Sequence, residues 1–358
     1  MDQALAERVR RRQPRVWPRS AYLWGWVQAS LQLVVFAASV ALLQSETRPL
    51  LVLALSMTCG WAWFCLLMVG HDAMHNAFAP SRSVNRLVAF LALDCLLFSR
   101  VTWLHAHHVV HHARPFSSED GMFLRHRSVA GDMLHLLALM FRYLGADALR
   151  LVTKPRWDEW LGMCVRLTLF WILLPLALLP ALLFLLLFGN YLGLLPHALP
   201  VVARTLDPVV RQLRTSWDLF PGSFLACLVT GGLNAHATHH VFPALPRGAQ
   251  WMGSRILREE AGEEYRCVTS LADLWTLFQM RTHGTMVAGS VAAIVAGSIP
   301  ASVGLIEALR NSQPDGTSAR GRHADRRISD RRVAQVPIAF PDRRLGDRRG
   351  TGVRTAIS

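Results

Sequence analysis

Residues 49–75 read PLLVLALSMTCGWAWFCLLMVGHDAMH, an apolar run that ends in two histidines four positions apart. The apolar part is long enough to cross the roughly 30 Å hydrocarbon core of a bilayer as one helix. Residues 22–44 form a second apolar run of similar length, and only a short polar link separates the two runs. We therefore predict an antiparallel membrane hairpin that brings His71 and His75 out at a membrane edge.

The composition indicates a membrane protein rather than a water-soluble domain, because 52% of the 358 residues are hydrophobic and only 17% are charged. The net charge of +14 lies mainly in a leader at residues 1–21 and a tail at residues 310–358. A basic leader before the first span predicts a cytoplasmic N-terminus, because cytoplasmic flanks of spans carry excess positive charge. We interpret the leader as a mobile segment on anionic membrane lipids, and we expect no nucleic-acid partner.

Residues 161–200 form the longest apolar block, which would reach about 60 Å as one helix and therefore predicts two spans. Residues 87–99 are too short to span and predict an interfacial helix, and residues 131–152 predict an amphipathic helix on the membrane or over the site. The expected fold is an all-α integral membrane protein with four spanning helices in two hairpins and a cytoplasmic histidine-rich cap. The expected spans are residues 22–44, 49–70, 161–179 and 181–200.

The C-terminal part of the chain is less regular. Residues 284–308 are apolar and rich in small residues, which predicts either a fifth span or a helix packed against the other spans. We favour the packed helix, because a fifth span would place the basic tail outside the cytoplasm. The tail repeats Asp-Arg-Arg four times and is expected to be disordered. The predicted domains are the leader (1–21), a membrane domain (22–260), a C-terminal cap with an apolar helix (261–309) and the Arg-rich tail (310–358).

Ten of the fifteen histidines lie in three clusters, each beside an apolar stretch. Within each cluster, histidines three or four residues apart would share one face of a helix. Neutral imidazole is a common ligand of transition metals, and eight such ligands exceed the needs of one ion. The pattern therefore predicts two metal ions. The expected ligands are His71, His75, His108, His111, His112, His236, His239 and His240.

The second cluster, residues 105–112, holds five histidines and leaves its ligand set open. Both His107 and His108 can combine with the pair at 111 and 112, and we favour His108 for its spacing of three and four residues. His105 and His107 are then accessory candidates. Further candidates are Asp72, Asp94 and Asp120 for orienting the imidazoles, Asn234 for a metal-linked water, and His197 near the end of the fourth predicted span.

Three segments resemble the histidine boxes of the membrane fatty acid desaturase superfamily: HDAMH at 71–75, HVVHH at 108–112, and NAHATHHVFPALP at 234–246. The third segment is the most specific of them, and the resemblance covers about residues 20–250. It implies a non-haem centre of two Fe ions, with O2 as co-substrate, on the cytoplasmic side of a four-span bundle. It also implies an acyl-lipid substrate and a separate electron donor of ferredoxin or cytochrome type.

By this resemblance we expect an oxidoreductase, a fatty acyl desaturase, in the bacterial inner membrane with its active site in the cytoplasm. A lipid or carotenoid hydroxylase or ketolase of the same superfamily is the alternative, because HDAMH also occurs in its carotenoid oxygenases. A histidine-rich metal transporter or sensor is a third hypothesis. It predicts polar ligands at mid-membrane depth, and the spans hold almost none.

Overall fold

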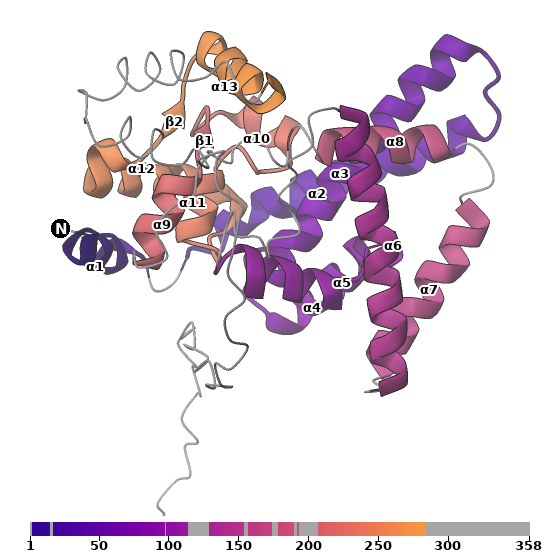
Figure 1. Ribbon diagram of the computed structural model, residues 1–358, viewed down its shortest axis with the longest axis horizontal. Helices are drawn as coiled ribbons and strands as arrows, with labels where there is room; N and C mark the ends of the chain where they lie inside the picture. Colours follow the sequence, from indigo (N-terminus) through magenta and orange to yellow (C-terminus); the bar gives the residue numbers. More distant parts are fainter. Residues whose placement is uncertain are drawn as a thin grey trace, which may run out of the picture. The chain divides into compact units, whose positions relative to one another are not determined.

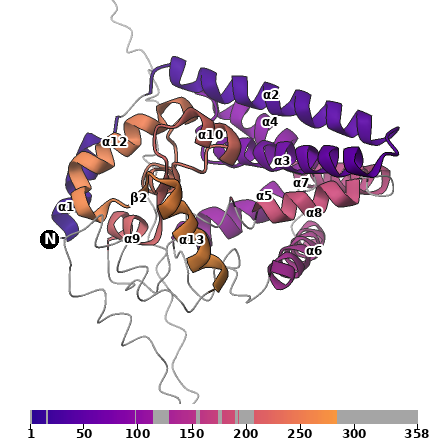
Figure 2. The same ribbon diagram turned by 90° about the horizontal axis from the view of Figure 1, so that it is seen from above.

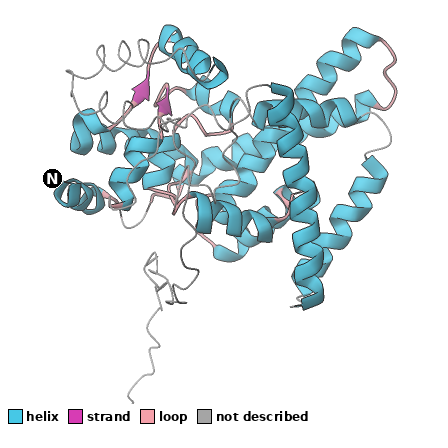
Figure 3. Ribbon diagram, in the orientation of Figure 1, coloured by secondary structure: helices cyan, strands magenta, loops and turns pink. Residues whose placement is uncertain are grey.

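The structure is a computed structural model, and it describes residues 2–14, 17–96, 98–113, 129–153, 157–173, 178–189, 192 and 207–283. These residues are mostly helical (Figures 1 and 3). The all-α prediction misses one small feature, a parallel pair of two-residue strands, β1 (Asp218–Leu219) and β2 (Cys267–Val268). The longer helices are α1 (Asp2–Arg12), α2 (Ser20–Leu43), α3 (Pro49–Met74), α4 (Arg82–Ala92), α6 (Val129–Thr153), α7 (Trp157–Leu173), α8 (Leu178–Phe188), α9 (Pro208–Thr215), α12 (Gln250–Ala261) and α13 (Leu271–His283).

Helices α2 and α3 follow each other in the chain and pack along each other (Figure 2), while their arrangement as a membrane hairpin stays a prediction. In the described part of the chain, these are the two single helices long and apolar enough to cross a membrane. A third span results if Arg82–Leu96 and Arg100–His108, which meet at 112°, are counted as one broken element. Pro49 begins α3, where its missing N–H costs no hydrogen bond.

Helix α2 buries both of its glutamines and exposes many of its large apolar side chains. Gln28 and Gln32 are fully buried, whereas Leu23 and Val34 are 63% and 66% exposed. A helix facing water would show the reverse pattern, because exposed apolar surface is unfavourable there. This distribution fits a helix whose outer face contacts lipid, and the chain is accordingly a membrane protein.

Helix α8 packs against α3 at a glycine. A Cβ added to Gly60 would lie 2.6 Å from the carbonyl oxygen of Ala181 and 2.7 Å from Cβ of Phe184. Helix α8 falls in the predicted 161–200 block and α7 overlaps it from Trp157, but each is shorter than the expected spans at 161–179 and 181–200. The arrangement with four spans therefore stays a prediction.

Replacing Gly60 by alanine is expected to force α8 away from α3, because the new methyl group meets backbone atoms that cannot rotate aside. We expect a loss of about 1–3 kcal/mol of unfolding free energy, as for other overpacked interiors. Thermal unfolding in detergent would measure it. Gly145→Ala on α6 is the matched control, since a Cβ there meets nothing within 4 Å; an equal loss in both variants would contradict the close contact.

The predicted mobile leader is wrong for residues 2–12, which form helix α1 and pack against α9 and α12. Leu5, Ala6 and Val9 are buried on one face of α1. Arg10 and Arg12 pair with acidic residues at 2.8 and 2.6 Å on the exposed side. The abundance of arginine in the leader concealed this apolar stripe, which is too short to stand out in composition.

The two other predicted helices have counterparts with different boundaries. The interfacial helix expected at 87–99 corresponds to α4, which begins earlier because Ser81 caps its first turn by accepting a hydrogen bond from the Val84 N–H. The helix expected at 131–152 corresponds to α6. Their placement relative to a bilayer stays a prediction. Residues 284–308, the tail at 310–358, and most of the second half of the 181–200 span lie outside the described residues.

Candidate metal centre

The first histidine cluster lies at the C-terminal end of α3. His71 is in the last turn of the helix, and His75 is the residue that caps it. The chain leaves the helix at Asn76, which has a left-handed φ of 57°. Asparagine tolerates this conformation better than most residues and is common directly after a helix end. The turn fixes His75 close to His71, with ring centroids 4.9 Å apart.

The second cluster lies on a π-helix, η2 (Leu104–His111), which follows the short helix α5 (Arg100–Trp103). In a π-helix the backbone hydrogen bonds join residues five apart, and the His112 N–H donates to the His107 carbonyl at 2.9 Å. Residues five apart therefore share a face. Nε2 of His107 lies 3.0 Å from Nε2 of His112, so these two imidazoles point to the same place.

The third cluster forms helix α11 (His236–Val241), which is only six residues long. Its three histidines are buried and divide between two directions. His239 approaches His71, with ring centroids 4.4 Å apart. His236 and His240 approach His111, and the ring of His240 is 5.0 Å from that of His111.

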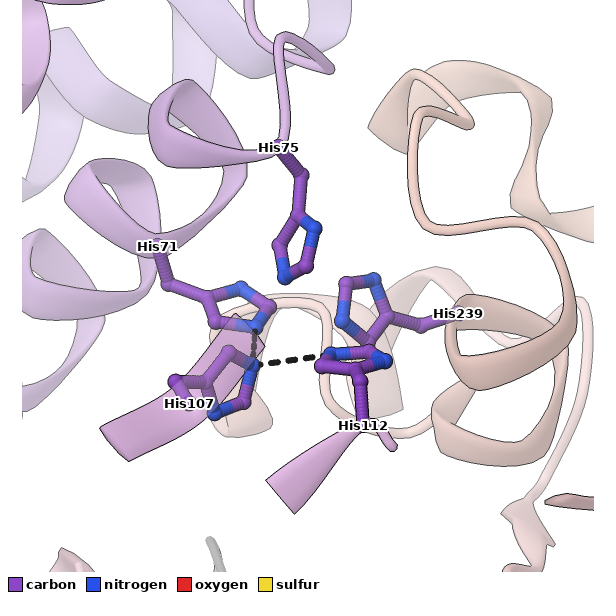
Figure 4. Close-up of side chains that lie close together, drawn as sticks. All are labelled: His71, His75, His107, His112 and His239. Carbon is purple, nitrogen blue, oxygen red and sulfur yellow. Dashed lines mark hydrogen bonds between the residues drawn. The ribbon is translucent and has the colours of Figure 1, made fainter. Parts of the chain in front are cut away.

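Members of all three clusters meet in two groups that could each hold a metal ion. Within each group, the available ligand nitrogens all lie within 4.8 Å of one another. Figure 4 shows the larger group, with its imidazoles converging from α3, η2 and α11. The five-histidine group contains His71, His75, His107, His112 and His239, and the three-histidine group contains His111, His236 and His240.

This geometry differs from the sequence prediction at one position. His107 takes part in the five-histidine group, whereas His108 belongs to neither group. The ring of His108 instead stacks on His75, with centroids 3.8 Å apart, and His105 is exposed. The prediction favoured His108 because it assumed α-helical spacing, and no feature of the sequence indicates the π-helix.

Three histidines of the five-histidine group, His75, His107 and His239, are held neutral, which is the form that binds metals. Burial, followed by the neighbouring imidazoles, lowers the pKa values of His75, His107 and His239 well below the ordinary value. Among the described residues, the two ring nitrogens of His75 have no hydrogen-bond partner, and Nε2 of His239 has none either. A buried polar atom without a partner is costly, and a metal ion would satisfy these nitrogens. The donor set therefore fits metal ions.

Residues 47–270 match the family model described as fatty acid desaturase, which is more than half of the chain. The chain belongs to the fatty acid desaturase family. No curated protein matches it. The matched segment includes α3, η2 and α11, and therefore both groups of histidines. In this desaturase family member, the resemblance seen in the three sequence segments is thus confirmed.

Asp72 lies where the sequence suggested, beside an imidazole of the five-histidine group. Its Oδ1 is 3.1 Å from Nδ1 of His71, while its Oδ2 accepts a hydrogen bond from Nε of Arg247 at 2.9 Å. Arg247 also donates to Oε1 of Gln28 on α2 at 3.0 Å, and its side chain is buried. Gly232, with φ of 93°, leaves room for it, since a Cβ there would lie 2.8 Å from Nε of Arg247. The sequence did not indicate Arg247.

Gln212 on α9 is a second residue beside the histidine groups that the sequence did not indicate. Its Oε1 lies 2.5 Å from Nδ1 of His240, and its amide donates a hydrogen bond to the carbonyl of His112. Because a carbonyl oxygen only accepts, Nδ1 of His240 carries the proton and Nε2 keeps the lone pair that a metal needs. Gln212 thus contacts residues of both groups, and it is 100 residues from His112 and 28 residues from His240, so no local pattern indicates it.

The other accessory candidates do not join the two groups. Asp94 pairs with Arg100 at 3.0 Å and with Arg166, whose guanidinium also bonds Asp147, so it belongs to a buried ionic network between α6 and α7. Asn234 is buried directly before α11, and its Oδ1 has no hydrogen-bond partner among the described residues. Asp120 and His197 lie outside the described residues.

Proposed function

We propose that this protein is an O2-dependent fatty acyl desaturase that inserts a double bond into an acyl chain at a centre of two iron ions. The observation that carries the proposal is the pair of adjacent, buried histidine groups within a desaturase family segment. Two groups suit two ions, and imidazole is a suitable ligand for iron. The five-histidine and three-histidine groups would hold one ion each.

The reaction removes two hydrogens from neighbouring methylene groups of the acyl chain. Two electrons and two protons come from these C–H bonds, two electrons come from an external ferredoxin- or cytochrome-type donor and two protons from the solvent, so that O2 is reduced to two molecules of water. The bound iron ions supply the activation of O2. The protein residues orient the ligands: Asp72 through Nδ1 of His71, and Gln212 through Nδ1 of His240.

The apolar surroundings of the site suit an acyl chain. Trp63 and Leu182 belong to a buried cluster between α3 and α8, and Leu233 brings this cluster next to the third histidine segment. Apolar side chains of this kind exclude water from the site and can fix which methylene group of the acyl chain faces the metals. We place the site on the cytoplasmic side of a bacterial inner membrane, where a soluble electron donor can reach it.

A lipid or carotenoid hydroxylase or ketolase is the second candidate, because the same histidine groups serve oxygen insertion equally well and HDAMH resembles box one of carotenoid oxygenases. The decisive experiment compares membrane lipids of a host with and without the expressed chain, by mass spectrometry. We expect a new double bond in the acyl chains. A new hydroxyl or keto group would establish the alternative, and neither product would refute both proposals.

Metal analysis of the purified protein is expected to give about two irons per chain, in keeping with the two groups of ligands. Treatment with a strong chelator should remove the iron and the activity together, and readdition of Fe²⁺ should restore both. The His239→Ala variant is the control, because it lacks one ligand of the five-histidine group. Zinc in place of iron in the active preparation would contradict the proposed centre.

A further inference from the structure

Thr238 lies on the face of α11 opposite to the three histidines. An α-helix turns about 100° per residue, so His236, His239 and His240 lie between about 100° and 200° from Thr238 around the helix axis. The structure agrees, since Thr238 is fully buried and its hydroxyl contacts Asp218 and Ser254 and no histidine among the hydrogen bonds of the described residues. A contact that holds Thr238 therefore holds the rotation of all three imidazoles about the helix axis.

Asp218 makes that contact. Its Oδ1 accepts a hydrogen bond from the Thr238 N–H at 3.1 Å, and its Oδ2 accepts one from the Thr238 hydroxyl at 2.5 Å. The hydroxyls of Ser254 on α12 and of Tyr265 donate to the same Oδ2 at 2.9 and 2.6 Å. The carboxylate is fully buried, and these four donors replace the water it would otherwise bind.

The backbone around Asp218 is itself fixed. Asp218 lies on β1, where its N–H donates to the carbonyl of Arg266 at 3.1 Å, and the next N–H donates to the carbonyl of Asn234 at 2.6 Å. From the other side, α12 approaches Thr238 at a glycine, because a Cβ added to Gly253 would lie 2.6 Å from its Cγ2. Thr238 is thus held between a paired strand and a close helix.

Helix α11 needs such external contacts. Six residues are too few for a helix that is stable by its own hydrogen bonds. It is also one of the two elements, with η2, that supply histidines to both groups. A small rotation would move His239 out of the five-histidine group and His240 out of the three-histidine group at once.

We propose that Asp218 is a positioning residue for the metal centre: acting through Thr238, it sets the rotation of α11 that divides the third histidine cluster between the two groups. The proposal rests on the metal-binding function proposed above. Asp218 touches no histidine ring in the contacts of the described residues, so its effect is transmitted by the helix.

The test compares Asp218→Asn and Thr238→Val with Thr238→Ser. Asparagine keeps the shape of the carboxylate but removes its charge, and valine keeps the shape of threonine but removes the hydroxyl donor. Serine keeps that donor, so Thr238→Ser should retain the Co²⁺ binding of the wild type. Thr276→Val is the matched control, because the Thr276 hydroxyl bonds only to the carbonyl of Ala272 on α13, outside this network. The readout is Co²⁺ binding to the metal-free full-length protein, followed by visible absorption, together with thermal unfolding of the metal-free protein.

We expect Asp218→Asn and Thr238→Val to bind Co²⁺ about 10- to 100-fold more weakly, the loss typical of removing a group that orients metal ligands. The absorption spectrum should also change, while Thr238→Ser and Thr276→Val match the wild type. Wild-type affinity and spectrum in both test variants would overturn the proposal.

If both test variants fail to fold, Tyr265→Phe decides the question, because it removes one donor to Asp218 and keeps the ring. Weaker Co²⁺ binding at an unchanged unfolding temperature supports the positioning role, and unchanged binding overturns it. Failure of the wild-type protein to bind Co²⁺ is a distinct result, since it would overturn the proposed function from which this inference starts.

Discussion

Replacing His107 by alanine is expected to remove metal from the five-histidine group and to abolish turnover. Nε2 of His107 lies 2.8 Å from Nε2 of His71 and 3.0 Å from Nε2 of His112, so its imidazole is central to the group. The loss of a direct ligand should lower metal affinity by more than the roughly 10- to 100-fold that loss of an orienting partner costs. Iron content of the purified variant and lipid analysis of the expressing host would measure the two effects.

His108→Ala is the matched control, one residue away on the same π-helix. His108 belongs to neither group and is placed by stacking on His75. We therefore expect this variant to retain its iron and most of its activity. The opposite pattern, with metal lost on replacement of His108 and kept on replacement of His107, would show that the second cluster uses α-helical spacing in the working enzyme.

Replacing Arg247 by methionine is expected to destabilise the protein by about 3–5 kcal/mol, the usual cost of leaving one partner of a buried ion pair alone. The guanidinium bonds Asp72 on α3, Gln28 on α2 and the carbonyl of Met68, and its side chain is almost completely inaccessible. Methionine fills a similar volume without the charge. Denaturation in detergent, compared with wild type, would give the change in unfolding free energy.

Two further variants make this second prediction specific. Arg255→Met removes an arginine that is 59% exposed and pairs within its own helix, so it should change stability by less than about 1 kcal/mol. Adding Asp72→Asn to Arg247→Met removes the uncompensated carboxylate and should restore part of the stability. A double variant no more stable than Arg247→Met would show that the loss comes from packing and not from the buried charge.

The hairpin of α2 and α3 and the convergence of the three clusters follow from patterns that sequence displays directly. Long apolar runs give the helices, and a short link requires them to be antiparallel. The family resemblance rests on histidines at fixed spacings, and the match of residues 47–270 to the family model confirms it. The helices and the histidine spacings depend on residues that are neighbours in the chain, and so they could be predicted.

The finer geometry of the site depends on partners that are distant in the chain. Asp218 and Tyr265 are separated by 47 residues, and Arg247 and Asp72 by 175. No local pattern reports such pairs. The choice between His107 and His108 depends on whether the backbone hydrogen bonds join residues four or five apart. The five histidines of the second cluster are compatible with either pattern, so the sequence does not decide between an α-helix and a π-helix.

Helix α1 has a consequence for the order of events during synthesis. Its buried face, with Leu5 and Val9, packs in a cluster with Leu257 of α12, and Arg12 pairs with Glu259, 247 positions later. At a translation rate of about 5–20 residues per second, α1 waits roughly 10 to 50 seconds after its own synthesis before these partners emerge. A ribosome stalled before residue 257 would therefore leave α1 with α9 but without its partners on α12, whatever the state of the spans.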